Sequence, residues 1–267
     1  MSATTAASEL LCEEKEAVLT LTLNRPDVLN ALTMGMMKSL IENLRKAEKD
    51  KKIRCVVLTA AGRAFCAGAD LGDLRKRQAA QAFSLGDELR RHFNPLILQI
   101  RKMEKPVVGA VNGLAAGAGA SLILSCDLKV CSEKATFINA FSRVGLVPDS
   151  GMTYFMPRFL GLSLALEHAW TAKPIKAEQA LHFGWVNRVV PAERLSAETA
   201  KLAGELTQCP PLSVALTKRA MNRALETNLE EQMQYEAQLQ EILGKTKDHQ
   251  EGVTAFLEKR PPQFKGE

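Results

Sequence analysis

One acidic side chain stands out because of its neighbours. Asp149 lies in the segment GLVPDSG, between Pro148 and Ser150, and the segments on either side are apolar or aromatic. Apolar surroundings raise the pKa of a carboxyl group, which can then take up and release a proton near neutral pH. Asp149 therefore has two interpretations that can coexist: a catalytic proton carrier, or a turn carboxylate that caps a helix beginning in SGMTYF.

The elements that must position this loop alternate along the first two thirds of the chain. The leucines of AVLTLTL alternate with threonines, which predicts a strand with one buried face. Apolar residues at helical spacing from Met37 to Ala47 predict a helix, and RCVVLTA predicts a buried strand. The turn-rich AGRAFCAGADL precedes a polar helical stretch that ends near residue 93.

The middle of the chain carries no charge from Val107 to Cys126, a run long enough to span a bilayer. Its glycines make a poor continuous helix, so we predict a buried strand (PVVGAV), a glycine-rich turn (NGLAAGAG) and a buried helix (ASLILS) instead. Strand-like segments follow at DLKVCSE, ATFINAF and NRVVP.

Helices dominate the rest of the chain. Strands and helices alternate early and helices prevail late, which predicts an α/β fold with a helical C-terminal part. We expect residues 1–200 to form the core with the site and residues 201–267 to form a helical region of the same structural unit. The late helices either pack on that core or build a subunit interface.

Composition argues against several other classes of protein. The net charge is +5, but basic and acidic residues are interspersed and aromatic residues make up only 5%, so a nucleic-acid surface is not predicted. The cysteines form no CxxC pair and the histidines lack ligand spacing, so we expect reduced thiols, a cytoplasmic protein and no metal. The first residues resemble no signal peptide, and the last three are no peroxisomal address.

Four segments in order carry a family resemblance: NRPDVLNAL, AFCAGADL, PVVGAVNGLAAGAGASLILSCD and FGWVNRVVP. Together they resemble the enoyl-CoA hydratase/isomerase (crotonase) family over nearly the whole chain. The resemblance implies a spiral of ββα units assembled into trimers or dimers of trimers. It also implies an acyl-CoA substrate, with coenzyme A as part of the substrate and no other cofactor.

The resemblance also implies roles for individual residues. Two backbone N–H groups of the family stabilise the negative charge on the thioester oxygen, and by motif position they belong here to Ala67 and Ala118. The alternative is that these small residues only permit tight turns. Substrate or coenzyme A contacts are implied for Arg25, Val28, Asn30, Ala69, Asp70, Leu71, Leu114, Gly117, Phe141, Phe264 and Lys265.

The chain departs from the family at two positions. A family hydratase uses a pair of glutamates where this chain has Ser121 and Phe141, and neither side chain can act as a general base near pH 7. Asp149 is left as the single acid, as in the family's isomerases, and GLVPDSG and the C-terminal tail most resemble 1,2-epoxyphenylacetyl-CoA isomerases. We therefore expect an isomerase that moves a double bond or rearranges a ring with one carboxylate.

Three alternatives remain open. The same fold could host a hydratase or thioester hydrolase that uses a water held by Ser121 or Asp149. The loss of both hydratase glutamates also permits a non-catalytic acyl-CoA-binding or structural protein. An RNA-binding scaffold has only the basic pI of about 8.9 in its favour.

Overall fold

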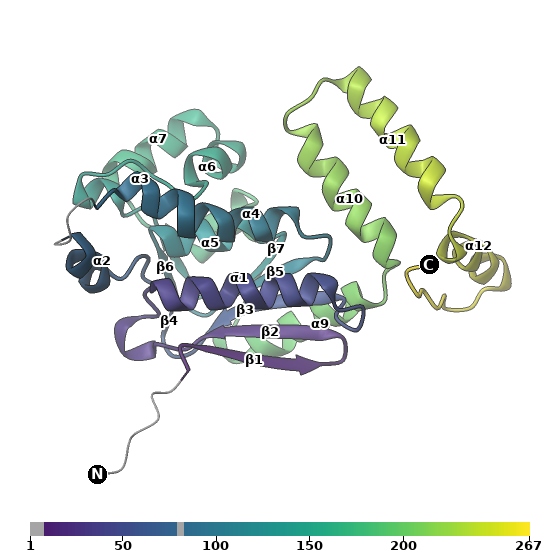
Figure 1. Ribbon diagram of the computed structural model, residues 1–267, viewed down its shortest axis with the longest axis horizontal. Coiled ribbons are helices and arrows are strands. Elements are labelled where there is room, and N and C mark those ends of the chain that lie inside the picture. Colours follow the sequence, from purple (N-terminus) through teal and green to yellow (C-terminus); the bar gives the residue numbers. More distant parts are fainter. Residues whose placement is uncertain (1–7, 79–82) are drawn as a thin grey trace, which may run out of the picture.

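The computed structural model describes residues 8–78 and 83–267, and its main sheet has six strands in the order β1-β2-β3-β5-β7-β10 (Figure 1). β1 pairs antiparallel with β2, and the other neighbouring strands are parallel. Their bounds are β1 (Leu10–Lys15), β2 (Val18–Leu23), β3 (Cys55–Ala60), β5 (Val107–Val111), β7 (Leu128–Ser132) and β10 (Arg188–Val190).

A smaller sheet collects short strands in the order β4-β6-β8-β9. These are β4 (Ala64–Cys66), β6 (Leu114–Ala116), β8 (Thr136–Ile138) and β9 (Ile175–Lys176). β4, β6 and β8 each follow a strand of the main sheet within a few residues and run parallel to one another. The chain thus repeats a unit of two strands followed by helix, which confirms the predicted α/β fold built from ββα units.

Helices cover both faces of the main sheet, and each face has its own apolar cluster. The larger cluster includes the buried side of α1 (Met34–Lys49) and residues of α4 (Asn94–Lys102) and α5 (Ala118–Ser125). The smaller one lies under α9 (Leu195–Thr207) and contains Val57, Val108 and Leu202. Because α5 is buried over its whole length, its N-terminal turn lies at a fixed place in the core.

The described part of the first two thirds of the chain contains five further α-helices. They are α2 (Leu71–Gln78), α3 (Leu85–Glu88), α6 (Met152–Leu160), α7 (Leu162–Thr171) and α8 (Ala177–His182). A π-helical turn covers Leu89–Phe93, and short 3-10 helices cover Pro26–Val28, Phe141–Val144 and Ala192–Arg194. None of the helices in the described parts of the chain combines the length and apolar composition that a bilayer crossing requires.

Three C-terminal helices leave the body of the molecule as an arm (Figure 1). They are α10 (Pro211–Ala224), α11 (Leu229–Leu243) and α12 (Lys247–Glu258). The predicted boundary after residue 200 falls inside α9, which packs on the sheet, so the part that projects begins with α10.

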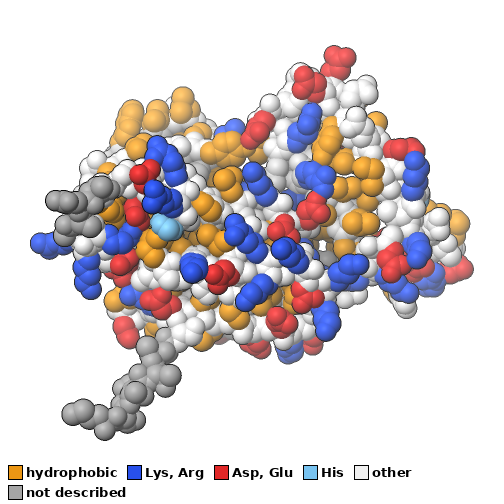
Figure 2. All heavy atoms as spheres, in the orientation of Figure 1, with side chains coloured by type: hydrophobic (Ala, Val, Ile, Leu, Met, Phe, Trp, Pro, Cys, Tyr) orange, Lys and Arg blue, Asp and Glu red, His pale blue; other side chains and the backbone are white. Residues whose placement is uncertain are grey.

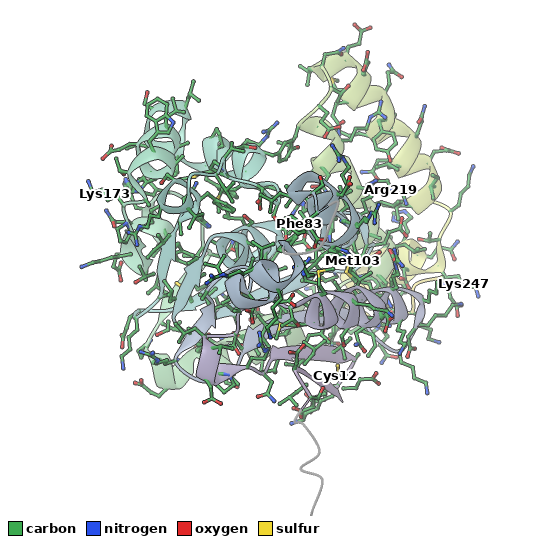
Figure 3. The ribbon with its side chains drawn as sticks, turned by 60° about the vertical axis from the view of Figure 1, so that its left-hand side comes forward. Cys12, Phe83, Met103, Lys173, Arg219 and Lys247 are labelled. Atoms are coloured by element: carbon green, nitrogen blue, oxygen red, sulfur yellow. The ribbon has the colours of Figure 1, made fainter. Side chains whose placement is uncertain are left out.

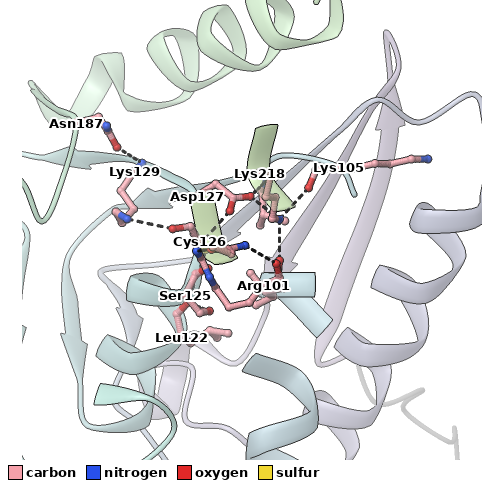
Figure 4. A network of polar contacts seen from close by, with 12 residues as sticks. Arg101, Lys105, Leu122, Ser125, Cys126, Asp127, Lys129, Asn187 and Lys218 are labelled. Carbon is pink, nitrogen blue, oxygen red and sulfur yellow. Dashed lines mark hydrogen bonds and ion pairs between the residues drawn. The ribbon is translucent and has the colours of Figure 1, made fainter. Parts of the chain in front are cut away.

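An ion-pair network joins the arm to the core (Figure 4). Lys218 of α10 lies 2.7 Å from the Asp127 carboxylate and also donates to the carbonyls of Ile100 and Lys105. Arg101 of α4 approaches the other oxygen of Asp127 at 3.3 Å. The arm is therefore attached through a partly buried carboxylate that two cations neutralise.

Candidate active site

The Asp149 loop connects the 3-10 helix Phe141–Val144 to α6 and has an unusual backbone. Ser150 and Gly151 follow Asp149 with φ angles of 52° and 81°, so two successive residues are left-handed. A Cβ on Gly151 would lie 2.7 Å from the ring of Phe155, so only glycine fits there. Strained backbone of this kind is common at functional sites and persists only where the surroundings hold it.

The Asp149 side chain is half-buried, and its one hydrogen bond within the described residues comes from the Ser150 hydroxyl, at 2.8 Å. Burial raises the pKa of Asp149 and the Ser150 hydrogen bond partly opposes that rise. α6 begins after Gly151 with no side-chain cap, and Asp149 contributes only its main-chain carbonyl, which accepts the Met152 N–H at 2.9 Å. The helix-capping interpretation of Asp149 is therefore wrong.

Ser121 lies on α5 directly against this loop. Its side chain is fully buried, and its hydroxyl is 3.0 Å from the main-chain carbonyl oxygen of Asp149 and 3.4 Å from that of Gly117. A hydroxyl enclosed in this way does not face a substrate. The geometry therefore gives no support to a reactive water held by Ser121.

The N-terminal turn of α5 is the second part of the site. Gly117 has φ 50° and donates its N–H to the Ile138 carbonyl at 2.9 Å, so the helix begins with Ala118. The Ala118 N–H has no hydrogen-bond acceptor within residues 8–78 and 83–267, as expected for the first turn of a helix. Such a group is free to donate to an anion.

The loop after β4 packs against this turn. A Cβ on Gly68 would lie 3.0 Å from the Ala116 carbonyl oxygen and 3.5 Å from the Ala118 nitrogen. A Cβ on Gly119 would lie 2.4 Å from the Cys66 carbonyl oxygen. Both glycines are thus required for backbone to meet backbone, which brings the two predicted donor segments together.

The backbone N–H of this loop that is free to donate to a ligand is not the predicted one. The Ala67 N–H donates to the Leu29 carbonyl at 2.9 Å, so it is already used and does not fit the predicted role. Leu32 forms a bridge with Ala69 by bonding to its two neighbours, Gly68 and Asp70. This pattern leaves the Ala69 N–H without an acceptor in the described parts of the chain, two residues beyond the predicted donor.

Two predicted contact residues lie beside the α5 turn. Phe141 is buried, and its ring reaches within 4.0 Å of the position that a Cβ of Gly117 would occupy. Leu114 is half-buried at the start of β6, the strand that leads directly into the same turn. Phe141 thus places apolar surface at the turn where a family hydratase would have a carboxylate.

The polar residues of the NRPDVLNAL segment bind one another. The Arg25 guanidinium forms ion pairs with Asp70 at 2.8 Å and with Glu9 at 3.1 Å. Asn30 is fully buried, accepts the Arg25 N–H, and donates to the carbonyls of Ala61 and Ala64, all at 2.8 Å. The predicted ligand contact of Asn30 is therefore wrong, because its side chain is buried and holds the loop in place.

Asp70 and Arg25 are likewise engaged within the protein. Asp70 accepts the backbone N–H of Asp73 at 3.0 Å and caps the first turn of α2; this bond, followed by the Arg25 interaction, lowers its pKa. The Arg25 guanidinium is therefore paired within the protein and not free for the predicted coenzyme A contact. Val28 and Leu71, by contrast, are 46% and 61% exposed and remain available to a ligand.

The predicted C-terminal contacts lie far from Asp149 in the same chain. Phe264 packs on Gly252 of α12, and the Lys265 N–H donates to Asp248 at 2.7 Å. Arg143, just before the Asp149 loop, donates to the carbonyl of Ala172 at the end of α7, and Figure 3 shows the adjacent Lys173 and Lys247, at the start of α12, on opposite sides of the molecule. One chain does not bring Phe264 or Lys265 to the site.

Sequence reasoning missed Ser150 and the free Ala69 amide. The adjacency of serine to aspartate in PDSG was the available signal for Ser150. No local signal marks Ala69, because its availability depends on the bridge to Leu32. The described residues contain no group of three His, Cys, Asp or Glu side chains that could hold a metal ion.

The chain matches the enoyl-CoA hydratase/isomerase family over residues 13–267. It is 42% identical to a 1,2-epoxyphenylacetyl-CoA isomerase of Escherichia coli, covering 96% of this chain and 98% of that one. A probable enoyl-CoA hydratase of Rhodobacter capsulatus is 41% identical, with 95% and 96% covered. A crystal structure described as enoyl-CoA hydratase subunit I of Geobacillus kaustophilus superposes with a TM-score of 0.90 at 37% identity, covering 97% and 99%.

Proposed function

The chain belongs to the enoyl-CoA hydratase/isomerase family, and we propose that it is an isomerase that moves a double bond or rearranges a ring in a CoA thioester. The observation that carries this proposal is the half-buried Asp149, whose pKa burial raises, together with the absence of a carboxylate at Ser121 and Phe141. A single carboxylate suits proton transfer within one substrate, because the same group can remove a proton and return it.

The proposed reaction begins with the Asp149 carboxylate. It takes a proton from a carbon of the acyl group, and the electron pair of the broken C–H bond is delocalised onto the thioester oxygen as an enolate. The protonated Asp149 then returns the proton to the carbon two positions further along the acyl chain. In a 3-enoyl thioester the proton leaves C2 and returns to C4, and the double bond moves from C3–C4 to C2–C3. No atom is gained or lost, and the carboxylate is regenerated.

The enolate oxygen would be held by backbone donors. We propose the N–H groups of Ala69 and Ala118, since both lack an acceptor in the described chain and Gly68 packs beside the Ala118 nitrogen. Removing one donor of this kind typically lowers turnover by about 10²–10³-fold. Coenzyme A would enter as part of the substrate, and the mechanism uses no other cofactor.

Hydration is the second candidate, because relatives that are 41% and 36% identical carry hydratase names. It needs a group to activate water. The fully buried Ser121 hydroxyl faces the Asp149 carbonyl, and Phe141 offers only apolar surface, so Asp149 would have to do this alone.

The assembly we propose is a trimer or a dimer of trimers. Exposed hydrophobic side chains gather on the arm (Figure 2), among them Leu229, Phe256 and Leu257 at 73–83% exposure. A neighbour covering this face would also allow its own Phe264 and Lys265 to approach another chain's site. Light scattering should give at least three times 29.2 kDa; a monomer at micromolar concentration would contradict this.

The test of function compares two substrates. Purified protein is incubated with a 3-enoyl-CoA and, separately, with a 2-enoyl-CoA, and the products are separated. We expect conversion of the 3-enoyl to the 2-enoyl thioester, with deuterium entering the product in D₂O wherever the returned proton has exchanged. Rapid formation of 3-hydroxyacyl-CoA from the 2-enoyl thioester would establish the hydratase instead.

A further inference from the structure

We propose that Ser121 is a positioning residue whose hydroxyl fixes the Asp149 loop to the N-terminal half of α5. The inference rests on the proposed isomerase function and concerns the same site. Ser121 is fully buried, so it does not contact the substrate. Its hydroxyl instead joins two segments that are 28 residues apart, through a 3.0 Å bond to the Asp149 carbonyl oxygen.

The Asp149 carbonyl is held from two sides. It accepts the Ser121 hydroxyl from α5 and the Met152 N–H, at 2.9 Å, from the start of α6. The next two residues, Ser150 and Gly151, have left-handed backbone. The Met152 bond closes the turn only locally, at the start of the adjoining α6. Within the described residues, the Ser121 bond is therefore the one that ties the main chain of Asp149 to an element distant in the sequence.

The same helix carries a proposed enolate donor. Ala118 precedes Ser121 by three residues, about one turn, so the two groups lie on one rigid element at a separation of roughly 5 Å. The Ser121 hydroxyl therefore sets the Asp149 carboxylate relative to the Ala118 N–H. A misplacement of about 1 Å in such an arrangement can lower turnover by roughly 10²-fold.

A serine that only supports the fold would behave differently, and the chain offers a matched control. Ser125 lies one turn later on α5 and is also fully buried. Its hydroxyl bonds to the Leu122 carbonyl within the helix, at 2.6 Å. Both hydroxyls contact a carbonyl one turn back along the chain, Gly117 for Ser121 and Leu122 for Ser125, but of the two only Ser121 also reaches the Asp149 loop.

The experiment measures kcat, KM and the pH profile of kcat for isomerisation of a 3-enoyl-CoA by Ser121→Ala and Ser125→Ala. For Ser121→Ala we expect kcat to fall by about 10–100-fold with KM changed less than about twofold. The acidic limb of its profile should move as the carboxylate environment changes. For Ser125→Ala we expect kcat and the pH profile to stay close to wild type.

A double variant separates positioning from general damage. In an Asp149→Asn background, Ser121→Ala should lower the residual rate less than about twofold, since no proton carrier remains to be positioned. A folded Ser121→Ala enzyme with wild-type kcat would overturn the inference while leaving the function of Asp149 intact. If Ser121→Ala does not fold, Ser121→Cys decides in its place, because a thiol fills similar space but is too weak and too long a donor to reproduce the 3.0 Å bond. Wild-type kcat overturns the inference, and a kcat lowered at constant KM supports it.

Discussion

Two aspartates of this chain, Asp127 and Asp149, are both withdrawn from solvent but have opposite surroundings. Asp127 is 17% exposed and has Lys218 at 2.7 Å, Arg101 at 3.3 Å and the Val107 N–H at 2.8 Å. Asp149 has one neutral donor, Ser150, and no cation within salt-bridge distance among the described residues. The charge of Asp127 is neutralised by its partners, whereas partial burial of Asp149 disfavours its charged form.

The difference separates a carboxylate that holds structure from one that can react. Removing a charge from water costs free energy. The cations and the N–H beside Asp127 offset this cost, whereas Asp149 has no such cation beside it in the described chain. A proton carrier needs both protonation states to be accessible, and a close cation would lock the charged form. The proposed function therefore predicts separable effects: changes at Asp149 alter turnover, and changes at Asp127 alter the free energy of unfolding.

The largest effect is expected for Asp149→Asn. Asparagine keeps the shape of aspartate but cannot carry the proton, so isomerisation should fall by about 10³–10⁴-fold, the upper part of the range for general acid–base groups. Affinity for a CoA thioester should stay within a few-fold, measured by calorimetry. A variant that retains more than about a tenth of wild-type kcat would remove Asp149 from the mechanism.

The next effect is expected for Asp127→Asn. It leaves Lys218 and Arg101 without their anion. Breaking a fully buried pair typically costs about 3–5 kcal/mol of unfolding free energy, and because this one is partly exposed we expect a loss near the lower end of that range. Urea unfolding measures the change, and kcat of the folded fraction should stay near wild type. The matched control is Glu104→Gln, whose pair with Arg219 is half-exposed on both sides and should contribute less than about 1 kcal/mol.

A smaller effect of opposite sign is expected when Asp149→Asn is unfolded by heat. Burial raises the pKa of Asp149, so the folded state binds this proton more tightly than the unfolded state, and the charged carboxylate destabilises the fold above the raised pKa. The variant should have the higher Tm at pH 8. The advantage should shrink as the pH falls through the raised pKa toward 3.8, the unfolded value.

Much of the fold could be read from local patterns. Alternation identified β2, and its three buried leucines, Leu19, Leu21 and Leu23, are those of the pattern. β1 was missed because it is an edge strand in which only Leu10 is buried, so alternation is absent and pairing with β2 defines it. In the smaller sheet, β8 lies within the predicted strand-like segment ATFINAF, but β4, β6 and β9 were not predicted, since pairing with neighbouring strands defines them.

The site could be predicted from the sequence only where it depends on neighbouring residues. Asp149 stands out because a lone acid in an apolar segment is a property of the local sequence. The choice between Ala67 and Ala69 depends on Leu29 and Leu32, which approach from a distant segment and use one amide while leaving the other. The side-chain amide of Asn30 likewise donates to carbonyls more than 30 residues away in the sequence, which no local pattern reveals.

The smallest effect concerns the hydrogen bond that the Asp149 side chain accepts from Ser150. The Ser150 hydroxyl stabilises the carboxylate form and thereby lowers its pKa, against the larger effect of burial. In Ser150→Ala the pKa of Asp149 should rise further, and the acidic limb of the kcat profile should move to higher pH. Alanine keeps a Cβ at φ 52°, so the backbone strain is unchanged and the plateau rate should stay within about tenfold.

The control for this change is Ser142→Ala, because no hydrogen bond from the Ser142 hydroxyl is present within the described chain. Its pH profile should match that of wild type. An acidic limb that moves to lower pH in Ser150→Ala would mean that the hydroxyl withdraws the carboxylate from water rather than stabilising its charge. Asp149 would then owe its raised pKa to Ser150 as well as to its apolar neighbours, and the contrast with Asp127 would be sharper still, since even its one polar partner would oppose ionisation.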